Sequence, residues 1–150
     1  MVRGIDIIGH NKPLQQHWML RTAAFLVDLV IVTSPFWAFY VYTYFTSTHP
    51  RPPHLISLPF LAFVALTLYS IFMEHAANGR TVGKIIFRLR VKSSAGSLTI
   101  EKYAIRNLSK IFIGFLLIDW LLGLATEGDP RQRFTERIAE TYVIHEGGEW

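Results

Sequence analysis

Two long stretches without charged side chains constrain this sequence more than any other feature. Thr22 to Phe45 covers 24 residues with Asp28 as the only charged one, and Leu55 to Met73 covers 19 residues with none. A helix rises about 1.5 Å per residue, so about 20 residues cross the hydrocarbon core of a bilayer. A soluble domain of 150 residues would hardly enclose two such apolar helices. The sequence therefore predicts two transmembrane helices, over about residues 18–45 and 55–77.

Lysine and arginine are unevenly distributed around these two stretches. Residues 1–21 hold three of them, residues 46–54 one, residues 78–110 eight and residues 127–150 three. Positive residues mark the cytoplasmic side of membrane proteins, so we expect a multi-pass protein of the cell membrane with a cytoplasmic N-terminus. The polar first 16 residues argue against a cleaved signal peptide. This topology explains the net charge of +4 better than nucleic-acid binding does.

A third apolar run, Ile111 to Ala125, is only 15 residues long and carries Asp119 at its centre. It is short for a full crossing, which would also place three arginines of the C-terminal tail outside the cell. A return near Gly114 avoids this problem and is favoured. We therefore expect a broken or re-entrant third hydrophobic element over about residues 99–126.

Two short segments have the pattern of β-strands. Residues 85–92 alternate apolar with mostly basic side chains, and residues 141–144 are a second strand-like run. Pairing satisfies the backbone edge of both. We therefore expect an all-α membrane protein with a small cytoplasmic β pair, about 85–92 with 141–144. It forms a single domain, residues 1–150, with flexible tails at 1–14 and 146–150.

The acids inside the apolar stretches require an explanation, because a charge at the centre of a bilayer costs about 3 kcal/mol or more. Asp28 lies seven residues after Arg21, close to the same helix face, and Arg106 precedes Asp119. One hypothesis is a buried polar cluster of Arg21, Asp28, Arg106 and Asp119 that binds a cation or relays protons. The other is that these residues fix helix packing or partner binding and transport nothing. Spacing does not decide between them.

Several motifs resemble the RDD family of small membrane proteins, which is named for one arginine and two aspartates. R-T-A-A-F-L-V-D supplies Arg21 and Asp28, and L-L-I-D-W-L-L-G-L supplies Asp119. A-I-R-N-L resembles the motif around the family's later arginine, here Arg106. N-G-R-T-V-G-K-I-I-F-R-L-R-V resembles its cytoplasmic segment, and R-Q-R-F-T-E-R-I-A-E-T-Y-V-I its ending. The resemblance marks further motif residues: Gly79, Thr81, Gly83, Lys84, Arg90, Glu136 and Thr141.

The resemblance covers about residues 15–145 and implies a polytopic membrane protein. Transport of an unidentified ligand or ion is the usual suggestion for the family. Two departures occur near the end, where Glu136 replaces a common aspartate and Glu140 a usual glycine. A chain this small would form a transport pathway as a homo-oligomer, or would hold other membrane proteins as a scaffold.

Signals for other functions are weak. Gly79 to Lys84 is one residue short of a phosphate-binding loop and lacks its Ser or Thr. Glu74-His75 has no second histidine one turn away, so we expect it at the membrane interface rather than at a metal. The sequence has no cysteine, and no pattern activates a membrane serine. We expect no enzyme, no metal, no cofactor and no nucleic acid, and a basic cytoplasmic segment, including Lys84, attracted to anionic headgroups.

Overall fold

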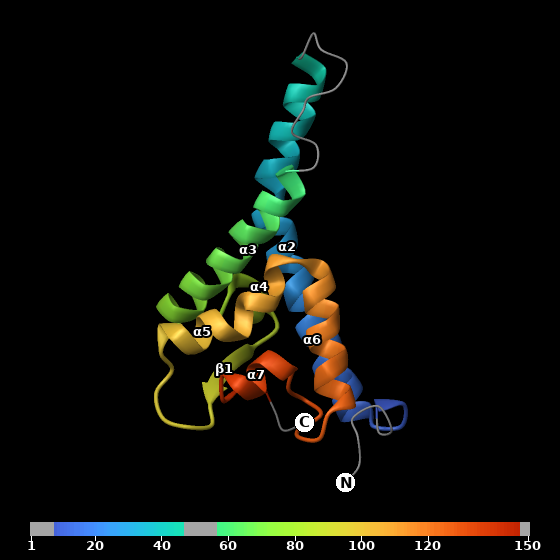
Figure 1. Ribbon diagram of the computed structural model, residues 1–150, viewed down its shortest axis with the longest axis vertical. Coiled ribbons are helices and arrows are strands. Elements are labelled where there is room, and N and C mark those ends of the chain that lie inside the picture. Colours follow the sequence, from blue (N-terminus) through green and yellow to red (C-terminus); the bar gives the residue numbers. More distant parts are fainter. Residues whose placement is uncertain (1–7, 47–56, 148–150) are drawn as a thin grey trace.

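The computed structural model describes residues 8–46 and 57–147, and two long helices dominate it. α2 spans Lys12–Thr46 and α3 spans Ser57–Ala76. By length and composition both can cross a membrane. Figure 1 shows the far half of α2 projecting away from shorter elements that gather around its first half. Both predicted spans are present, and residues 47–54 of the expected loop lie outside the described part of the chain.

α2 begins six residues before the predicted start. The side-chain oxygen of Asn11 accepts a hydrogen bond from the backbone N–H of Leu14 at 3.1 Å, which caps the helix before its apolar stretch. Leu14 and Trp18 then pack against Leu124 near the end of another helix. Tertiary packing therefore holds the first turns of α2.

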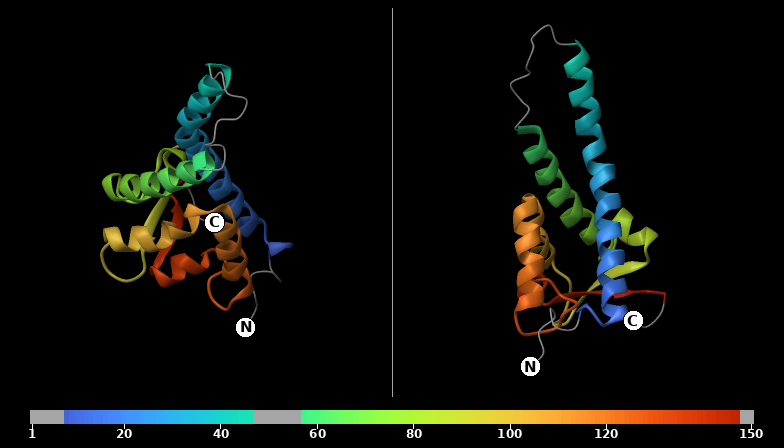
Figure 2. Two further views of the ribbon diagram at one scale, coloured as in Figure 1. Left: turned by 45° about the horizontal axis from the view of Figure 1, so that its top comes forward. Right: turned by 90° about the vertical axis from the view of Figure 1, so that its right-hand side faces the viewer.

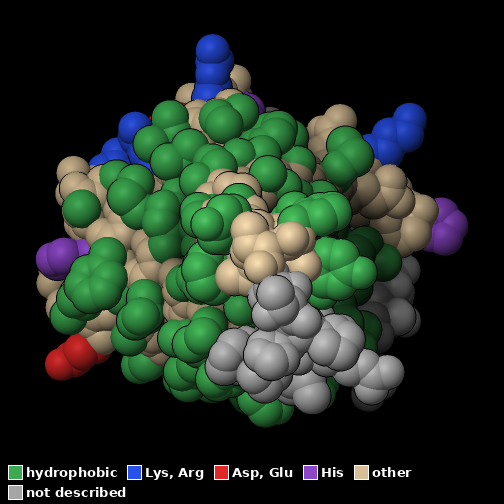
Figure 3. Space-filling model, turned by 90° about the horizontal axis from the view of Figure 1, so that it is seen from above, with side chains coloured by type: hydrophobic (Ala, Val, Ile, Leu, Met, Phe, Trp, Pro, Cys, Tyr) green, Lys and Arg blue, Asp and Glu red, His purple; other side chains and the backbone are tan. Residues whose placement is uncertain are grey.

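The surface of the long helices is apolar. Val30 and Phe39 on α2 and Phe72 on α3 are each at least 60% exposed. Figure 3, viewed toward the far end of α2, shows hydrophobic side chains over much of this face and most charged ones near its margin. Exposing this much apolar surface to water is unfavourable, and a lipid bilayer would cover it.

A small antiparallel sheet joins β1, Leu89–Ser93, to β2, Thr141–His145, with Val91 opposite Val143. This confirms the predicted pair, although β1 starts four residues later than expected. The residues before it form a short helix, α4, over Val82–Ile86. The sheet packs on α2 through a buried cluster that contains Ala24, Leu89, Val91, Tyr103 and Val143.

The third hydrophobic element is bent. α5 spans Ile100–Asn107, the 3₁₀ helix η1 spans Leu108–Ile111, and α6 spans Ile113–Ala125. The chain bends by 114° between the two arms, and Phe112 between them has extended backbone angles. The break lies two residues before the expected one at Gly114.

The chain returns after this bend. Leu124 at the far end of α6 contacts the start of α2, and the right-hand view of Figure 2 shows α6 alongside the first half of α2. A short helix, α7 over Phe134–Ile138, then leads to β2, which pairs with β1. The C-terminal elements thus lie at the end of the molecule where α2 begins, in agreement with the predicted return.

Candidate functional site: a buried charge network beside a cationic cavity

One carboxylate on α7 contacts three arginines. Oε1 of Glu136 accepts hydrogen bonds from Arg106 at 2.7 Å and Arg133 at 3.1 Å, and it also pairs with Arg21. Its second oxygen accepts the backbone N–H of Arg133 at 3.1 Å. The Glu136 side chain is completely buried. Because Arg21 belongs to α2 and Arg106 to α5, this carboxylate joins three helices.

A second carboxylate, Glu74 on α3, continues the network. It pairs with Lys84, and its other oxygen accepts hydrogen bonds from Arg106 at 2.6 Å and from Asn107 at 2.9 Å. Arg106 therefore bridges Glu74 and Glu136. Glu74 is fully buried, and the ammonium group of Lys84 points inward toward it. The position of Glu74 directly after an uncharged stretch was the one sequence signal for burial.

Asp28 binds the segment between α3 and β1. It accepts hydrogen bonds from the Thr81 hydroxyl at 2.5 Å, the Gly83 backbone N–H at 2.8 Å and the Tyr69 hydroxyl at 3.2 Å. Thr81 is also the N-cap of α4. These contacts assign a structural role to Thr81 and Gly83, because the loop and α4 supply the donors that a buried carboxylate needs.

Asp119 on α6 binds α7 and η1. It accepts hydrogen bonds from the Thr135 backbone N–H at 2.7 Å, the Thr135 hydroxyl at 2.8 Å and the Ser109 hydroxyl at 2.8 Å. Arg133 lies 3.7 Å away. The aspartate thereby closes the bend between η1 and α6.

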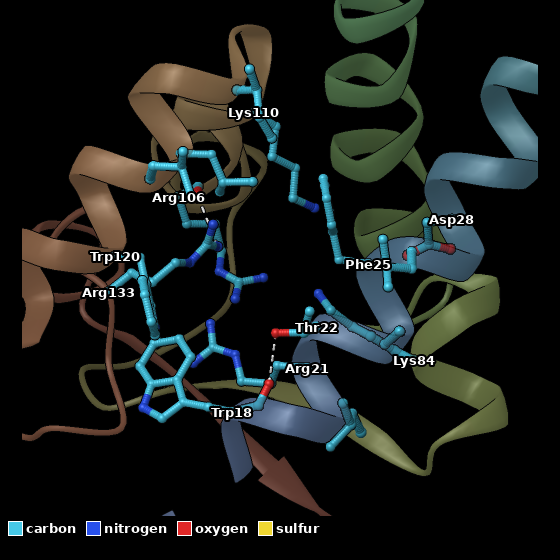
Figure 4. Close-up of a pocket in the computed structure, with 16 residues that line it drawn as sticks. Trp18, Arg21, Thr22, Phe25, Asp28, Lys84, Arg106, Lys110, Trp120 and Arg133 are labelled. Atoms are coloured by element: carbon cyan, nitrogen blue, oxygen red, sulfur yellow. Dashed lines mark hydrogen bonds between the residues drawn. The ribbon is translucent and has the colours of Figure 1, made fainter. Parts of the chain in front are cut away.

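A cavity of about 370 Å³ lies between α2, α4 and the bent pair. This volume falls in the range of small-molecule sites. Figure 4 shows that basic side chains from all of these elements converge on it. Its apolar wall includes Phe25, Leu26, Ile113, Leu117 and Trp120. Its cations are Arg21, Lys84, Arg106, Lys110 and Arg133.

Positive charge is in excess at this cavity. Five cations line it, and the four buried carboxylates of the site are Asp28, Glu74, Asp119 and Glu136. Lys110 accounts for the difference, because it is 7% exposed and forms no ion pair within residues 8–46 and 57–147. Its ammonium group donates to the Ser70 hydroxyl at 2.9 Å. Charging a buried amine that has no counter-ion is costly, so an anion bound here would stabilise the ammonium form of Lys110.

The family model for RDD proteins matches residues 16–140. The chain belongs to the RDD family. It is therefore a multi-pass membrane protein, in agreement with its two long apolar helices. The match contains every arginine and aspartate on which the resemblance depends. No curated protein and no solved structure matches the chain.

The arginines and aspartates of the RDD motifs make three separate sets of contacts. Arg21 and Arg106 meet at Glu136, Asp28 binds Thr81 and Gly83, and Asp119 binds Thr135. In the described residues Arg21 therefore pairs with Glu136 and not with Asp28. Three of the four residues expected in one cluster line the cavity: Arg21, Asp28 and Arg106. Asp119 reaches it through Arg133.

The remaining RDD motif residues support this framework. Gly79 has a φ of 86° and contacts the Val91 backbone so closely that a side chain would collide with it. Arg90 donates to the Asn78 carbonyl at 3.0 Å. The buried Thr141 hydroxyl donates to the Glu136 carbonyl at 3.4 Å. These positions shape the loop, the sheet and α7, and they do not line the cavity.

This environment shifts the pKa values of Lys84 on α4 and Glu136 on α7. Burial lowers the pKa of the Lys84 ammonium to about 8, although Glu74 acts against the shift. Burial alone would raise the pKa of the Glu136 carboxyl, but Arg21, Arg133 and Arg106 more than offset it and hold this pKa well below 4.5. Glu136 is therefore ionised at neutral pH, and Lys84 remains largely positive.

Replacing Asp28 by asparagine tests the framework role of this residue. The amide oxygen can accept from Gly83 and Tyr69, and the amide N–H can donate to Thr81, so we expect a loss of about 1–2 kcal/mol in unfolding free energy. Thermal unfolding in detergent measures it. Exposed Asp129, also replaced by asparagine, is the matched control. An equal loss in both variants would contradict the assignment.

Proposed function

We propose that this RDD protein binds a small anionic ligand in the cavity, as a step in moving that ligand across the membrane. The observation that carries the proposal is the buried Lys110, which has no ion pair among the residues that the structure describes and lies beside four further basic side chains. A low-dielectric surrounding strengthens the attraction between these cations and an anion. In this proposal the N-terminus is cytoplasmic and the protein lies in the cell membrane, so the cavity opens in the cytoplasmic half of the bilayer.

The contacts give less support to a cation or a proton as the ligand. All eight oxygens of the four buried carboxylates accept hydrogen bonds from N–H or O–H donors. An entering cation would have to displace these donors. No group of His, Asp and Glu suited to a metal ion occurs among the residues that the structure describes.

A scaffold role is the second candidate, and one observation favours it. Three of the four carboxylates, Asp28, Glu74 and Glu136, connect elements far apart in the chain, as Glu136 does for α2, α5 and α7. Such contacts can fix helix packing and present a surface to other membrane proteins. In that case Asp28→Asn changes the oligomer size or the co-purifying partners, and there is no ligand binding to lose.

Binding of two amphiphiles of opposite charge distinguishes a site for anions from a site for cations, and a scaffold without a ligand site would bind neither. Trp18 and Trp120 line the cavity, so their fluorescence reports a ligand. Titrating purified protein in an uncharged detergent, we expect saturable binding of decanoate and none of decyltrimethylammonium. Lys110→Gln should weaken decanoate binding about ten-fold, since one charged hydrogen bond contributes about 1.5 kcal/mol or more.

The matched control is Lys92→Gln, which removes the same charge from an exposed position on β1. It should bind decanoate as the unchanged protein does. Binding of the cationic amphiphile, no saturable binding of decanoate, or equal affinities in Lys110→Gln and Lys92→Gln would each overturn the proposed function.

A further inference from the structure

We propose that the ligand is an anionic phospholipid with one net negative charge, whose headgroup binds at Lys110 and Arg106 and whose acyl chains leave between α2 and α6. This inference rests on the proposed function, because it names the class of ligand that the same cavity takes.

The cavity has an apolar opening toward the bilayer. Leu26 on α2 and Ile113 and Leu117 on α6 line it and are 51%, 41% and 53% exposed. α2 and α6 contact each other near Trp18 and Leu124, at one end of the opening. Leu26 lies about two turns further along α2, where the wall is exposed. A ligand with hydrocarbon chains would cover these side chains, whereas a soluble anion would leave them uncovered.

The inner part of the cavity is suited to a phosphate. Figure 4 shows the ammonium groups of Lys110 and Lys84 directed toward the same space as the guanidinium of Arg106. Lys110 has no counter-ion in the described parts of the chain, and buried Nε of Arg106 has no hydrogen-bond partner there. Phosphate oxygens accept several hydrogen bonds at once from such groups.

The excess of positive charge at the site favours phospholipids with a negatively charged headgroup. With Lys110 in its ammonium form, the site has one more cation than carboxylates, so a phosphodiester with a single negative charge neutralises it. Phosphatidylglycerol has this charge. Phosphatidylcholine carries the same phosphate with a quaternary ammonium, which would have to lie among five cations at a repulsive cost. We therefore expect discrimination by headgroup charge at equal chain length.

Native mass spectrometry of the whole protein in an uncharged detergent tests the inference. The probes are phosphatidylglycerol and phosphatidylcholine with identical acyl chains, and soluble glycerol 3-phosphate. We expect one molecule of phosphatidylglycerol to bind about ten-fold more tightly than either other probe. Lys110→Gln should remove about ten-fold of that affinity, and Lys92→Gln should leave it unchanged.

A second variant keeps the test valid if Lys110→Gln fails to fold. Leu117→Trp enlarges an exposed side chain at the opening, so it should preserve folding and still weaken phosphatidylglycerol binding about ten-fold. Three outcomes overturn the inference: equal affinities for the two phospholipids, binding of glycerol 3-phosphate as tight as that of the lipid, or lipid binding unaffected by both variants. If decanoate binding still depends on Lys110, the proposed function stands without this inference; if that dependence is also absent, both fail.

Discussion

Replacing Glu136 by glutamine is expected to lower the free energy of unfolding by about 3–5 kcal/mol. Glutamine keeps the size of the side chain, but it removes the charge that Arg21, Arg106 and Arg133 share. Arg106 is 1% exposed, and among the described residues it would keep only Glu74 as a counter-ion. Thermal unfolding in detergent, followed by size-exclusion chromatography, measures the loss.

Glu140→Gln is the matched control. The Glu140 side chain is 55% exposed and lies 3.3 Å from Lys102, so its ion pair contributes about 0–1 kcal/mol. Both variants remove one carboxylate from the same part of the chain. If Glu136→Gln unfolds at the same temperature as Glu140→Gln, the three-arginine network does not hold the helices together.

Acidification tests the same carboxylate. The folded-state pKa of Glu136 lies well below 4.5, so its contribution to stability is complete above about pH 4.5 and is lost as pH falls through the folded-state pKa. We expect Glu136→Gln to lose less stability than the unchanged protein between pH 5 and pH 3, because it lacks this titration. Unfolding temperatures measured across that range give the comparison, and parallel curves would contradict the assignment.

Replacing Gly83 by alanine is expected to destabilise the protein by about 3 kcal/mol. A Cβ at this position would lie less than 3.0 Å from the carbonyl oxygen and 2.9 Å from the carbonyl carbon of Ala24. Both are backbone atoms of α2 and cannot rotate away. α4 would have to move from α2, and the hydrogen bond from Gly83 to Asp28 would lengthen or break. The expected result is a lower unfolding temperature and weaker decanoate binding, because Lys84 moves with α4.

Gly9→Ala is the control for this substitution. A Cβ on Gly9 meets no atom within 4 Å among those described, and its φ is not positive. Its unfolding temperature should change little. Equal stability of the two variants would show that α4 does not require close contact with α2.

The proposed ligand site and the stabilising network share residues. Arg106 is bound to Glu74 and Glu136 and also lines the cavity, whereas Lys110 lines it without an ion pair in the described part of the chain. A substitution at Arg106 would therefore change both the stability of the protein and its affinity for the ligand. Substitutions at Lys110 and at the exposed Leu117 are expected to change ligand affinity with less effect on stability.

The sequence by itself determined the membrane class, the two spans, the bent third element and the pair of strands. Each depends on a local pattern: an uncharged run about as long as a bilayer is thick, a run too short to cross, or alternation with period two. The RDD motifs identified Arg21, Asp28, Arg106 and Asp119 because these residue types occur at recognisable positions along the chain.

Only the tertiary structure decided which charges meet. Arg21 and its partner Glu136 are 115 positions apart, and Thr81 is 53 positions from Asp28. Helical spacing shows that Arg21 and Asp28 share a face, but it does not show which side chains that face contacts. The bend at Phe112 and the close approach of α4 to α2 at Gly83 determine those contacts. The burial of Glu74 and the lack of an ion pair at Lys110 within residues 8–46 and 57–147 follow from the same packing, because burial and pairing depend on neighbours distant in the sequence.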